Sequence, residues 1–462
     1  MHYPWWYVPF LTSPMLIAAV AVIHVYVSMY AVGGGLFLAV ETQYAHRSGN
    51  RDYLSYLKSH AWFFILLTVV FGAITGVGIW WTIGLASPLA TEMLIHAFVF
   101  GWAIEYVFFV LEIAAAFAFY YFWDRLEPTV HQIIGWIYGI SAWISLVLIT
   151  AITGFMLNSG AWPENPTFWV GFFNPQFLPQ TIARTGGALL LASLYVYLHA
   201  ALSRGDKDPE LLKLISRRST RPGLLGAILI TVGGAWWFVA LPSSAQAALM
   251  VASALNIFMV LIFSVTVVVF AMLYLGPYRN PGWITPGFAI LLFAFGLAAV
   301  GTGEFVREAV RKPYIVNRVV YSNQILPEEL ATLRESGYLE GGTWTHAYVS
   351  EHYPQVVDGA GQIDEAALLD LPEADRLEVG AVLYQYHCND CHAVEDGYTP
   401  VGQLTRGWTP EMVRLLVENP EKAHFFMPPF AGTPEEAELL TEYLLSISKP
   451  FPVDLLTTAD AE

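Results

Sequence analysis

The sequence predicts an all-α protein, in which a polytopic bundle of about eight membrane-spanning helices precedes a small all-α domain. Of the 462 residues, 56% are apolar and only 13% are charged, whereas roughly a quarter are charged in a soluble domain. This composition excludes an ordinary soluble protein and a disordered chain. Eight apolar stretches are long enough to cross about 30 Å of hydrocarbon. They are 15–42, 60–85, 91–122, 131–157, 178–202, 223–242, 246–275 and 285–306.

Charge divides the chain into two parts of different character. Residues 315–462 hold 25 acidic and 7 basic residues, whereas the first 314 residues hold 13 and 15, and the net charge is −16. Nucleic acid is therefore not an expected partner. We expect a membrane bundle over 1–314, a partly ordered acidic linker over 315–372, a small helical domain over 373–450 and a tail over 451–462.

The basic residues indicate how the bundle is oriented. They gather in loops 43–59, 203–222 and 276–284, each of which follows an odd-numbered span. Such loops stay on the cytoplasmic side, so both the N-terminus and the part after the eighth span are expected outside. The aromatic N-terminus has no basic n-region, which argues against a cleavable signal peptide. It suits an interfacial belt in contact with membrane lipid.

Both cysteines of the chain lie in Cys388-Asn-Asp-Cys391-His392, the C-x-x-C-H pattern of covalent haem c attachment. The two cysteines would form thioethers to the haem, and His392 would be the proximal axial ligand. A zinc half-site is the alternative, although no third cysteine could complete it. Haem c is attached on the outer side of bacterial membranes. The motif therefore agrees with the orientation and predicts a bacterial inner-membrane protein.

A second axial ligand is expected some tens of residues after the motif. Met427 fits, because the two prolines that follow it hold the loop extended, and His424 is the rival ligand. Next, Thr433 as N-cap, Pro434 at N1 and Glu436 at N3 predict a capped helix. In this layout, 373–450 resembles a small class I cytochrome c. His387, beside the motif, is expected to be a surface residue.

Few ionisable residues lie inside the predicted spans, and they are functional candidates because burying them is costly. Glu105 and Glu112 are seven residues apart and share one helix face. This suits a proton route, with two buried protonated carboxyls as the alternative. Either axial ligation or an internal hydrogen bond fits His24. The candidates are His24, His96, Glu105, Glu112, Arg184, His199, Glu304, Arg307, Glu308 and Arg311.

Several of these residues lie in segments that resemble subunit I of the cytochrome bd oxidase family over about residues 14–315. The Glu-Ala-Val-Arg-Lys-Pro-Tyr segment from Glu308 is similar to the family's Glu-x-x-Arg-Gln-Pro-Trp at the end of the eighth span. Glu112 precedes Trp-Asp-Arg-Leu at the family's spacing. His24 precedes Val-Glu-Thr, similar to a family His before Met-Glu-Thr, with an offset that differs by one residue.

The resemblance implies a role for each matched residue. His24 and Glu308 would ligate membrane haem, which is haem b or haem d in the family, with Arg311 nearby. Glu112 would lie on a proton path, with Glu105 one residue from the family's second carboxylate. The catalytic candidates are therefore Glu112, Glu105 and Arg311. The family works with a homologous second subunit, which implies a heteromeric respiratory complex.

The departures from the family are equally informative. Arg184 occupies the place of the histidine that binds a low-spin haem, and would pair instead with a haem propionate or a carboxylate of the third span. The long outer loop that forms the quinol site is reduced to about residues 241–244. Glu304 stands where the family has Trp. His96 remains open between a ligand and a structural role. The low-spin haem and the quinol site are thus expected to be lost together.

Three functions remain in view. The first is a bd-like oxidoreductase that receives electrons at an outer c haem from a c-type cytochrome or another redox partner, and passes them to membrane haems that reduce oxygen. The second is a non-catalytic electron-transfer subunit that links a quinone pool or partner enzyme to an external cytochrome. The third is a membrane anchor for the c domain, against which the buried carboxylates argue. His60, His131 and His199 are expected to be interfacial.

Overall fold

The structure, a computed structural model, describes residues 3–4, 6–204 and 208–448. The expected tail, 451–462, lies outside the described residues. The chain divides into two compact units, which we call the bundle unit (18–80 and 94–311) and the C-terminal unit (1–17, 81–93 and the residues from 312 onward). Each unit is described by itself.

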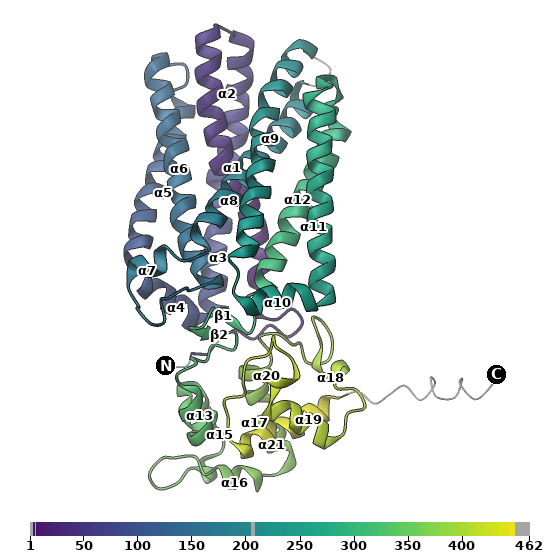
Figure 1. The fold of residues 1–462 in the computed structure, drawn as a ribbon. Helices are drawn as coiled ribbons and strands as arrows, with labels where there is room; N and C mark the ends of the chain where they lie inside the picture. The colour runs from purple at the N-terminus through teal and green to yellow at the C-terminus, as the bar shows by residue number, and fades with distance from the viewer. Residues whose placement is uncertain (1–2, 5, 205–207, 449–462) are drawn as a thin grey trace, which may run out of the picture. The chain divides into compact units, whose positions relative to one another are not determined.

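Helices form the bundle unit almost entirely (Figure 1). Among the described residues, eight helical segments are long and apolar enough to cross a membrane, as the sequence predicts. The protein is therefore a multi-pass membrane protein. The elements are α1 (Ser13–Ser48), α2 (Arg51–Ile65), η1 (Leu66–Phe71), α3 (Gly72–Ala86), α4 (Pro88–Ala97), α5 (Val99–Tyr121), α6 (Pro128–Leu157), α7 (Phe168–Phe172), α8 (Phe177–Arg204), α9 (Pro209–Val239), α10 (Ser243–Val251), α11 (Ser253–Leu273), η2 (Tyr274–Tyr278), η3 (Pro281–Trp283) and α12 (Pro286–Ala309).

Several spans differ in detail from the expected stretches. The sixth begins at Pro209, and the seventh begins at Leu255, after the separate helix α10. The second runs without interruption from Arg51 to Ala86 and contains one π-helical segment, η1. The predicted third stretch, 91–122, is broken at Phe98, whose backbone leaves the helical region with φ −122° and ψ 28°. Residues 88–97 consequently form the separate short helix α4, and the third span begins at Val99.

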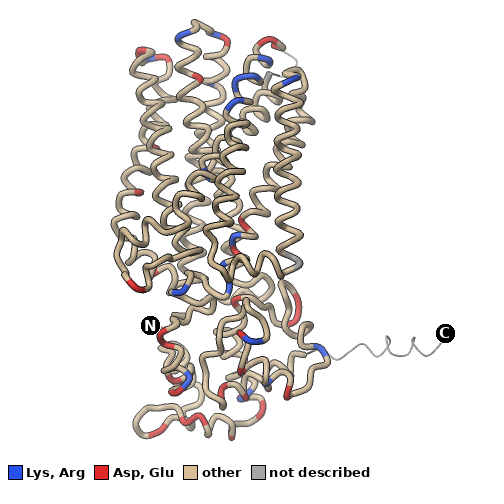
Figure 2. Tube along the Cα trace, in the orientation of Figure 1, with Lys and Arg blue, Asp and Glu red and all other residues tan. Residues whose placement is uncertain are grey.

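Small residues let the central helices approach closely. A Cβ at Gly186 of α8 would come within 2.6 Å of the Gly226 carbonyl oxygen of α9, so a side chain at either glycine would push the two backbones apart. Close approach at glycine is the usual way in which helices associate in a membrane. Large apolar side chains on the outer faces remain exposed, such as Val77 at 70% and Phe263 at 72%. Such faces suit lipid or a second subunit. Lysine and arginine gather at the end of the bundle where α8 ends and α9 begins (Figure 2).

The C-terminal unit holds a two-stranded antiparallel hairpin and short helices around one core. Side chains from the expected linker, including Leu339 and Val349, lie in the same core cluster as Leu383 and Leu440 of the predicted cytochrome domain. Residues 315–372 are therefore more ordered than their acidic composition suggests. The elements are β1 (Tyr314–Val316), β2 (Val320–Tyr321), α13 (Leu330–Ser336), α14 (Tyr338–Gly341), α15 (Thr343–His352), η4 (Pro354–Val356), α16 (Glu365–Leu369), α17 (Glu373–His387), α18 (Val401–Leu404), α19 (Pro410–Glu418), α20 (Pro420–Ala423) and α21 (Pro434–Ile447).

The N-terminal segment is part of this unit. The Tyr398 backbone N–H donates to the Phe10 carbonyl oxygen at 2.9 Å. Gly397 packs against the Phe10 backbone at φ +115°, a conformation that only glycine adopts without strain. Trp6 donates its backbone N–H to Leu85 at 2.8 Å.

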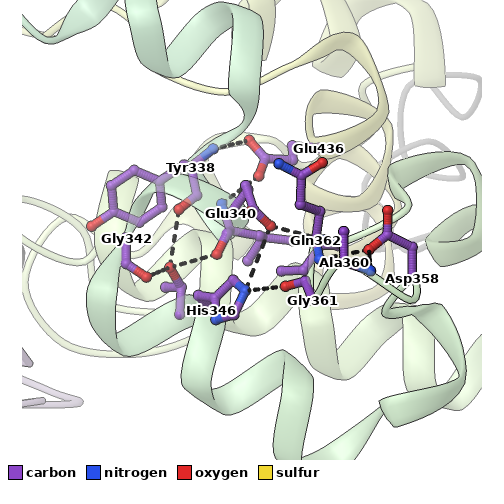
Figure 3. Close-up of polar contacts among 12 residues, drawn as sticks. Tyr338, Glu340, Gly342, His346, Asp358, Ala360, Gly361, Gln362 and Glu436 are labelled. Carbon is purple, nitrogen blue, oxygen red and sulfur yellow. Dashed lines mark hydrogen bonds and ion pairs between the residues drawn. The ribbon is translucent and has the colours of Figure 1, made fainter.

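A buried carboxyl on the last helix forms hydrogen bonds with residues of segment 315–372, which the sequence suggested to be a linker. Glu436, fully buried on α21, accepts the backbone N–H groups of Tyr338 at 2.9 Å and Leu339 at 2.5 Å, and forms the predicted capping box with Thr433 (Figure 3). A Cβ at Gly337 would overlap Glu365 Oε1 and come within 3.1 Å of Glu436 Oε1. The two carboxyls therefore lie close together. Burial, with a contribution from Glu365, raises the pKa of Glu436 to about 8.

Replacing Glu436 with alanine should destabilise the C-terminal unit by about 3 kcal/mol, because each buried N–H left without a partner costs roughly 1–3 kcal/mol. Denaturant unfolding of the full-length protein in detergent measures this. Glu438 is the matched control on the same helix. It is half-exposed and pairs with Arg414 at 3.2 Å, so Glu438→Ala should cost less than about 1 kcal/mol. Equal losses in the two variants would contradict the role of Glu436.

The raised pKa of Glu436 also predicts a pH dependence. Between its ordinary value of 4.5 and about 8, the folded protein retains a proton that the unfolded chain has released, so stability falls as the pH rises through this window. The melting temperature of the C-terminal unit should decrease from pH 6 to pH 9. Glu436→Gln, which resembles the protonated carboxyl, should flatten this dependence. If Glu436→Gln kept the wild-type dependence of melting temperature on pH, this dependence would come from other ionisable groups.

Candidate functional site

The C-x-x-C-H motif forms a tight turn directly after α17. Cys388 is the C-cap of that helix, and its carbonyl oxygen accepts the N–H groups of Cys391 at 3.1 Å and His392 at 3.0 Å. His392 Nδ1 lies 2.9 Å from the Thr399 carbonyl oxygen. A backbone carbonyl at this nitrogen fixes the orientation of the ring and leaves Nε2 for a metal.

Both cysteines of the motif are partly buried. Burial raises the pKa of Cys388 to about 12 and that of Cys391 to about 11, so both thiols are neutral before any attachment. Asp390, between them, accepts a hydrogen bond from Lys312 Nζ at 2.8 Å. This pair is largely buried, with 14% of the Lys312 side chain and 5% of the Asp390 side chain exposed. A positive charge therefore lies beside the motif.

The loop that carries Met427 follows α20, and the Met427 N–H donates to the His424 carbonyl oxygen at 2.9 Å. Burial lowers the pKa of His392, and the charges of Lys312 and His424 lower it further, which places His424 within electrostatic range of the ring. His424 itself is exposed, and its Nδ1 accepts the Phe426 N–H at 3.3 Å. Met427 is partly buried. Met427 as the second ligand, with His424 as its rival, therefore stays a prediction.

An apolar groove of about 470 Å³ lies along α19. Val413 and Val417 face the core, while Met412, Leu415 and Trp408 line the groove on the other side of the helix. The lining is mostly apolar but includes Asn419 and Lys422. Within the motif itself, the two thiols and His392 Nε2 fit covalent attachment of a porphyrin. His387 is not at the surface as expected, because its ring packs between Tyr338 and Phe430, with centroids 4.7 Å from each.

The bundle unit buries a cluster of charges around the end of α12. Glu304 and Arg307 form an ion pair at 2.8 Å, and Glu308 pairs with Arg311. Arg184 of α8 lies within electrostatic range of Glu304 and contacts Thr150 Oγ1 at 3.4 Å. Three arginines face two carboxylates, so a further anion would balance the cluster. This excess fits the propionates of a porphyrin, one of the two partners expected for Arg184.

The two expected membrane-haem ligands have different surroundings. His24 Nδ1 lies 3.1 Å from Thr75 Oγ1, and its ring rests against Gly76 of α3, which leaves Nε2 for a metal. Glu308 is held by Arg311, whose Nη1 also contacts Met156 Sδ at 3.7 Å. Metal ligation by Glu308 would therefore compete with this ion pair unless it used the other carboxylate oxygen. In the described part of the chain, no group of three or more His, Cys, Asp or Glu could hold a metal ion without a cofactor.

The expected proton-route residues do share one face of α5. Glu105 accepts a hydrogen bond from Ser145 of α6 at 2.8 Å. Glu112 lies within electrostatic range of Glu105, and its Oε1 is buried without a hydrogen-bond partner among the described residues. His96, in contrast, is exposed on α4 and lies outside the third span.

His60 and His131 are buried within the bundle, a feature that the expectation of interfacial positions for His60, His131 and His199 did not include. His60 is fully buried, and His131 is 1% exposed, with Nε2 2.9 Å from the Phe119 carbonyl oxygen. His60 contacts Tyr30 and His199. A signal for this was present, because Tyr53, Tyr56, His60 and Phe64 recur every three or four residues along α2 and thus form one buried face.

The chain therefore combines a multi-pass helix bundle, with buried arginines and carboxylates, and a unit with a C-x-x-C-H turn, the pattern of covalent haem attachment. Residues 13–240 match the family described as cytochrome bd terminal oxidase subunit I. Residues 375–444 match cytochrome c oxidase, cbb3-type, subunit III. The chain thus carries a cytochrome bd oxidase subunit I domain and a C-terminal cytochrome c domain.

The chain is also similar to a solved structure, the bd oxidase from Geobacillus thermodenitrificans. The TM-score is 0.57, the sequence identity is 17%, and the match covers 67% of this chain and 88% of that one. At this identity the likeness shows a shared fold. A search of curated proteins gives no match. The cytochrome c domain implies haem c, and subunits of the bd family typically pair with a second subunit.

Met427→His should keep covalent haem c but lower its reduction potential, because a thioether ligand holds the potential above that given by two histidines. A redox titration of the full-length protein measures the change, and loss of the methionine–iron absorption band accompanies it. His424→Gln is the matched control and should leave both unchanged. A lower potential in His424→Gln with no change in Met427→His would assign the ligand to His424.

Proposed function

We propose that this chain is a membrane respiratory oxidoreductase of the cytochrome bd type, which takes electrons at an outer c haem and uses membrane haems, b or d, to reduce oxygen. The observation that carries the proposal is the fusion of a bd subunit I domain to a cytochrome c domain in one chain. When bound, the haems supply one-electron transfer and, at an open axial position, oxygen binding.

Each candidate residue then has a definite task. Cys388 and Cys391 would attach the c haem, and His392 and Met427 would hold its iron. In the bundle, His24 Nε2 and the Glu308 carboxylate would hold membrane haem. Arg184 and Arg311 would neutralise its propionates. His96, exposed on α4, fits this set least well.

Protons would reach the bundle through α5. Glu112 has a buried oxygen without a hydrogen-bond partner among the described residues, and Glu105 is anchored by Ser145. A buried carboxyl in this state carries a proton more readily than a charge. Glu112 is therefore the group that would hold a proton, and Glu105 the group that would exchange it.

The electron donor is inferred from what the bundle lacks. The segment between the sixth and seventh spans covers only residues 240–254, and α10 takes up most of it. It is therefore short for a loop that could bind a quinol. The C-terminal unit is strongly acidic, which suits a basic c-type cytochrome as donor. We place the N-terminus and the C-terminal unit on the outer side of a bacterial inner membrane, with a second subunit beside the bundle.

The second candidate function is a non-catalytic electron-transfer subunit of a larger complex. One observation favours it, because Glu308 is engaged by Arg311 rather than presented freely to a ligand site. In that case the membrane haems would be six-coordinate and would not bind oxygen. They would link a quinone pool or a partner enzyme to the external cytochrome.

A pyridine haemochromogen spectrum of the purified full-length protein should show haem c together with haem b or d. Carbon monoxide should then shift the spectrum of the reduced membrane haem, because an oxygen-reducing haem has an open axial position. Membrane haems whose reduced spectrum does not change with carbon monoxide would establish the second function. Haem c alone would contradict both and leave a tethered cytochrome. His24→Gln should lose membrane haem while haem c stays, and His131→Gln is the control within the bundle.

A further inference from the structure

Three polar side chains from three helices meet in the core of the bundle, where the proposed mechanism does not use them. They are Tyr30 of α1, His60 of α2 and His199 of α8. The Tyr30 hydroxyl lies 3.0 Å from His60 Nε2, and the Nδ1 atoms of His60 and His199 are 3.2 Å apart. Tyr30 and His60 are both fully buried. The three groups thus form one continuous line of hydrogen bonds.

Aromatic rings insulate this line on its sides. Phe63 stacks on His199 with centroids 5.0 Å apart and an interplanar angle of 20°, and Phe37 meets His60 edge-on at 6.0 Å. Tyr195 stacks on Tyr30 at 4.0 Å. Burying polar groups costs free energy unless they are paired, so a core built for packing alone would be better served by leucine. We therefore expect these three hydrogen-bonded side chains to have a function other than packing.

The line has a direction within the bundle. His199 lies near the C-terminal end of α8, the end of the bundle at which the lysines and arginines gather (Figure 2). Tyr30 lies near the middle of α1. The neighbouring Ala31 carbonyl accepts the Tyr138 hydroxyl at 3.1 Å, and Tyr138 is within electrostatic range of Glu112. The line therefore leads from the basic end of the bundle toward the buried carboxyl of α5.

We propose that His199, His60 and Tyr30 form a proton relay that supplies Glu112 from the basic end of the bundle. A neutral imidazole has one donor and one acceptor nitrogen, which permits transfer in sequence. A proton that arrives at His199 Nε2 displaces the Nδ1 proton to His60 Nδ1. The proton on His60 Nε2 passes to the Tyr30 oxygen, and the original Tyr30 proton passes to a water molecule, which the proposal requires between Tyr30 and Glu112 and which delivers a proton to the Glu112 carboxylate. One proton enters and one leaves.

The nearby ionisable groups are outside the relay. Tyr53 donates to Glu41 at 2.8 Å, and Glu41 is held by Arg218. The Tyr56 hydroxyl donates to the Val196 carbonyl oxygen at 3.3 Å. The route as proposed begins at His199. This inference rests on the proposed function, because reducing oxygen consumes protons that the bundle must supply.

The first test does not depend on activity. In full-length protein with 15N-labelled histidine, a coupling across the hydrogen bond should join one nitrogen of His60 to one of His199, and His199→Ala should remove it. Absence of the coupling from the wild-type protein would overturn the relay, whatever haems are bound.

The second test follows proton uptake when dithionite reduces the membrane haems in proteoliposomes, with a pH-indicator dye as the readout. Tyr30→Phe removes one oxygen atom and should slow the uptake by about a hundredfold, the typical contribution of a positioned acid–base group. His199→Ala should slow it similarly, and added imidazole should restore the rate, which a packing defect would not allow. His131→Gln, a buried histidine outside the line, is the matched control.

The outcomes separate the two proposals. If Tyr30→Phe and His199→Ala take up protons at the wild-type rate, the relay is overturned, while the proposed oxidoreductase function still stands. A wild-type protein without membrane haem would overturn the proposed function, and with it the need for a proton supply. Should His199→Ala fail to fold, Tyr30→Phe decides the matter alone.

Discussion

Hydrocarbon offers a polar side chain no hydrogen-bond partner, so every polar group inside the bundle has to be satisfied by another part of the chain or by a bound group. This constraint makes each buried charge informative. Glu304, Arg307, Glu308 and Arg311 pair within one helix end, and Arg184 reaches them from α8. Their remaining positive charge is where a bound anion is needed most.

The same constraint explains the position of the histidines. His60 lies in a core of tyrosine and phenylalanine rings, where its two nitrogens reach Tyr30 and His199. His131 has a different partner: its Nε2 forms a hydrogen bond with the Phe119 carbonyl oxygen, and its ring stacks on the Phe119 ring with centroids 4.2 Å apart. Two histidines of similar burial thus differ in whether their partner can itself pass on a proton.

Sequence patterns predicted what depends on local periodicity. The eight spans, the Thr433 capping box and the common face of Glu105 and Glu112 all follow from spacing within one helix. The break at Phe98 carries no such pattern, which is why His96 was placed in a span. The C-x-x-C-H motif was also readable, because its chemistry is contained in five adjacent residues.

Contacts between distant segments could not be predicted in this way. His60 and His199 are 139 positions apart, and the Glu436 carboxyl meets Tyr338 across 98 positions. Acidic composition suggested a linker over 315–372, yet apolar residues such as Leu339 complete the core of the following domain. A few well-spaced apolar side chains outweigh many solvated charges, since only the former are buried.

The backbone hydrogen bond between Phe10 and Tyr398 affects when the chain can complete its fold during synthesis. The ribosome synthesises Phe10 long before Tyr398, so the N-terminal segment cannot form this hydrogen bond until nearly the whole polypeptide has been made. Because Tyr398 follows the cysteine motif by only a few residues, this contact and the complete motif both become available only late in synthesis. Chains that stop short of that stage lack both.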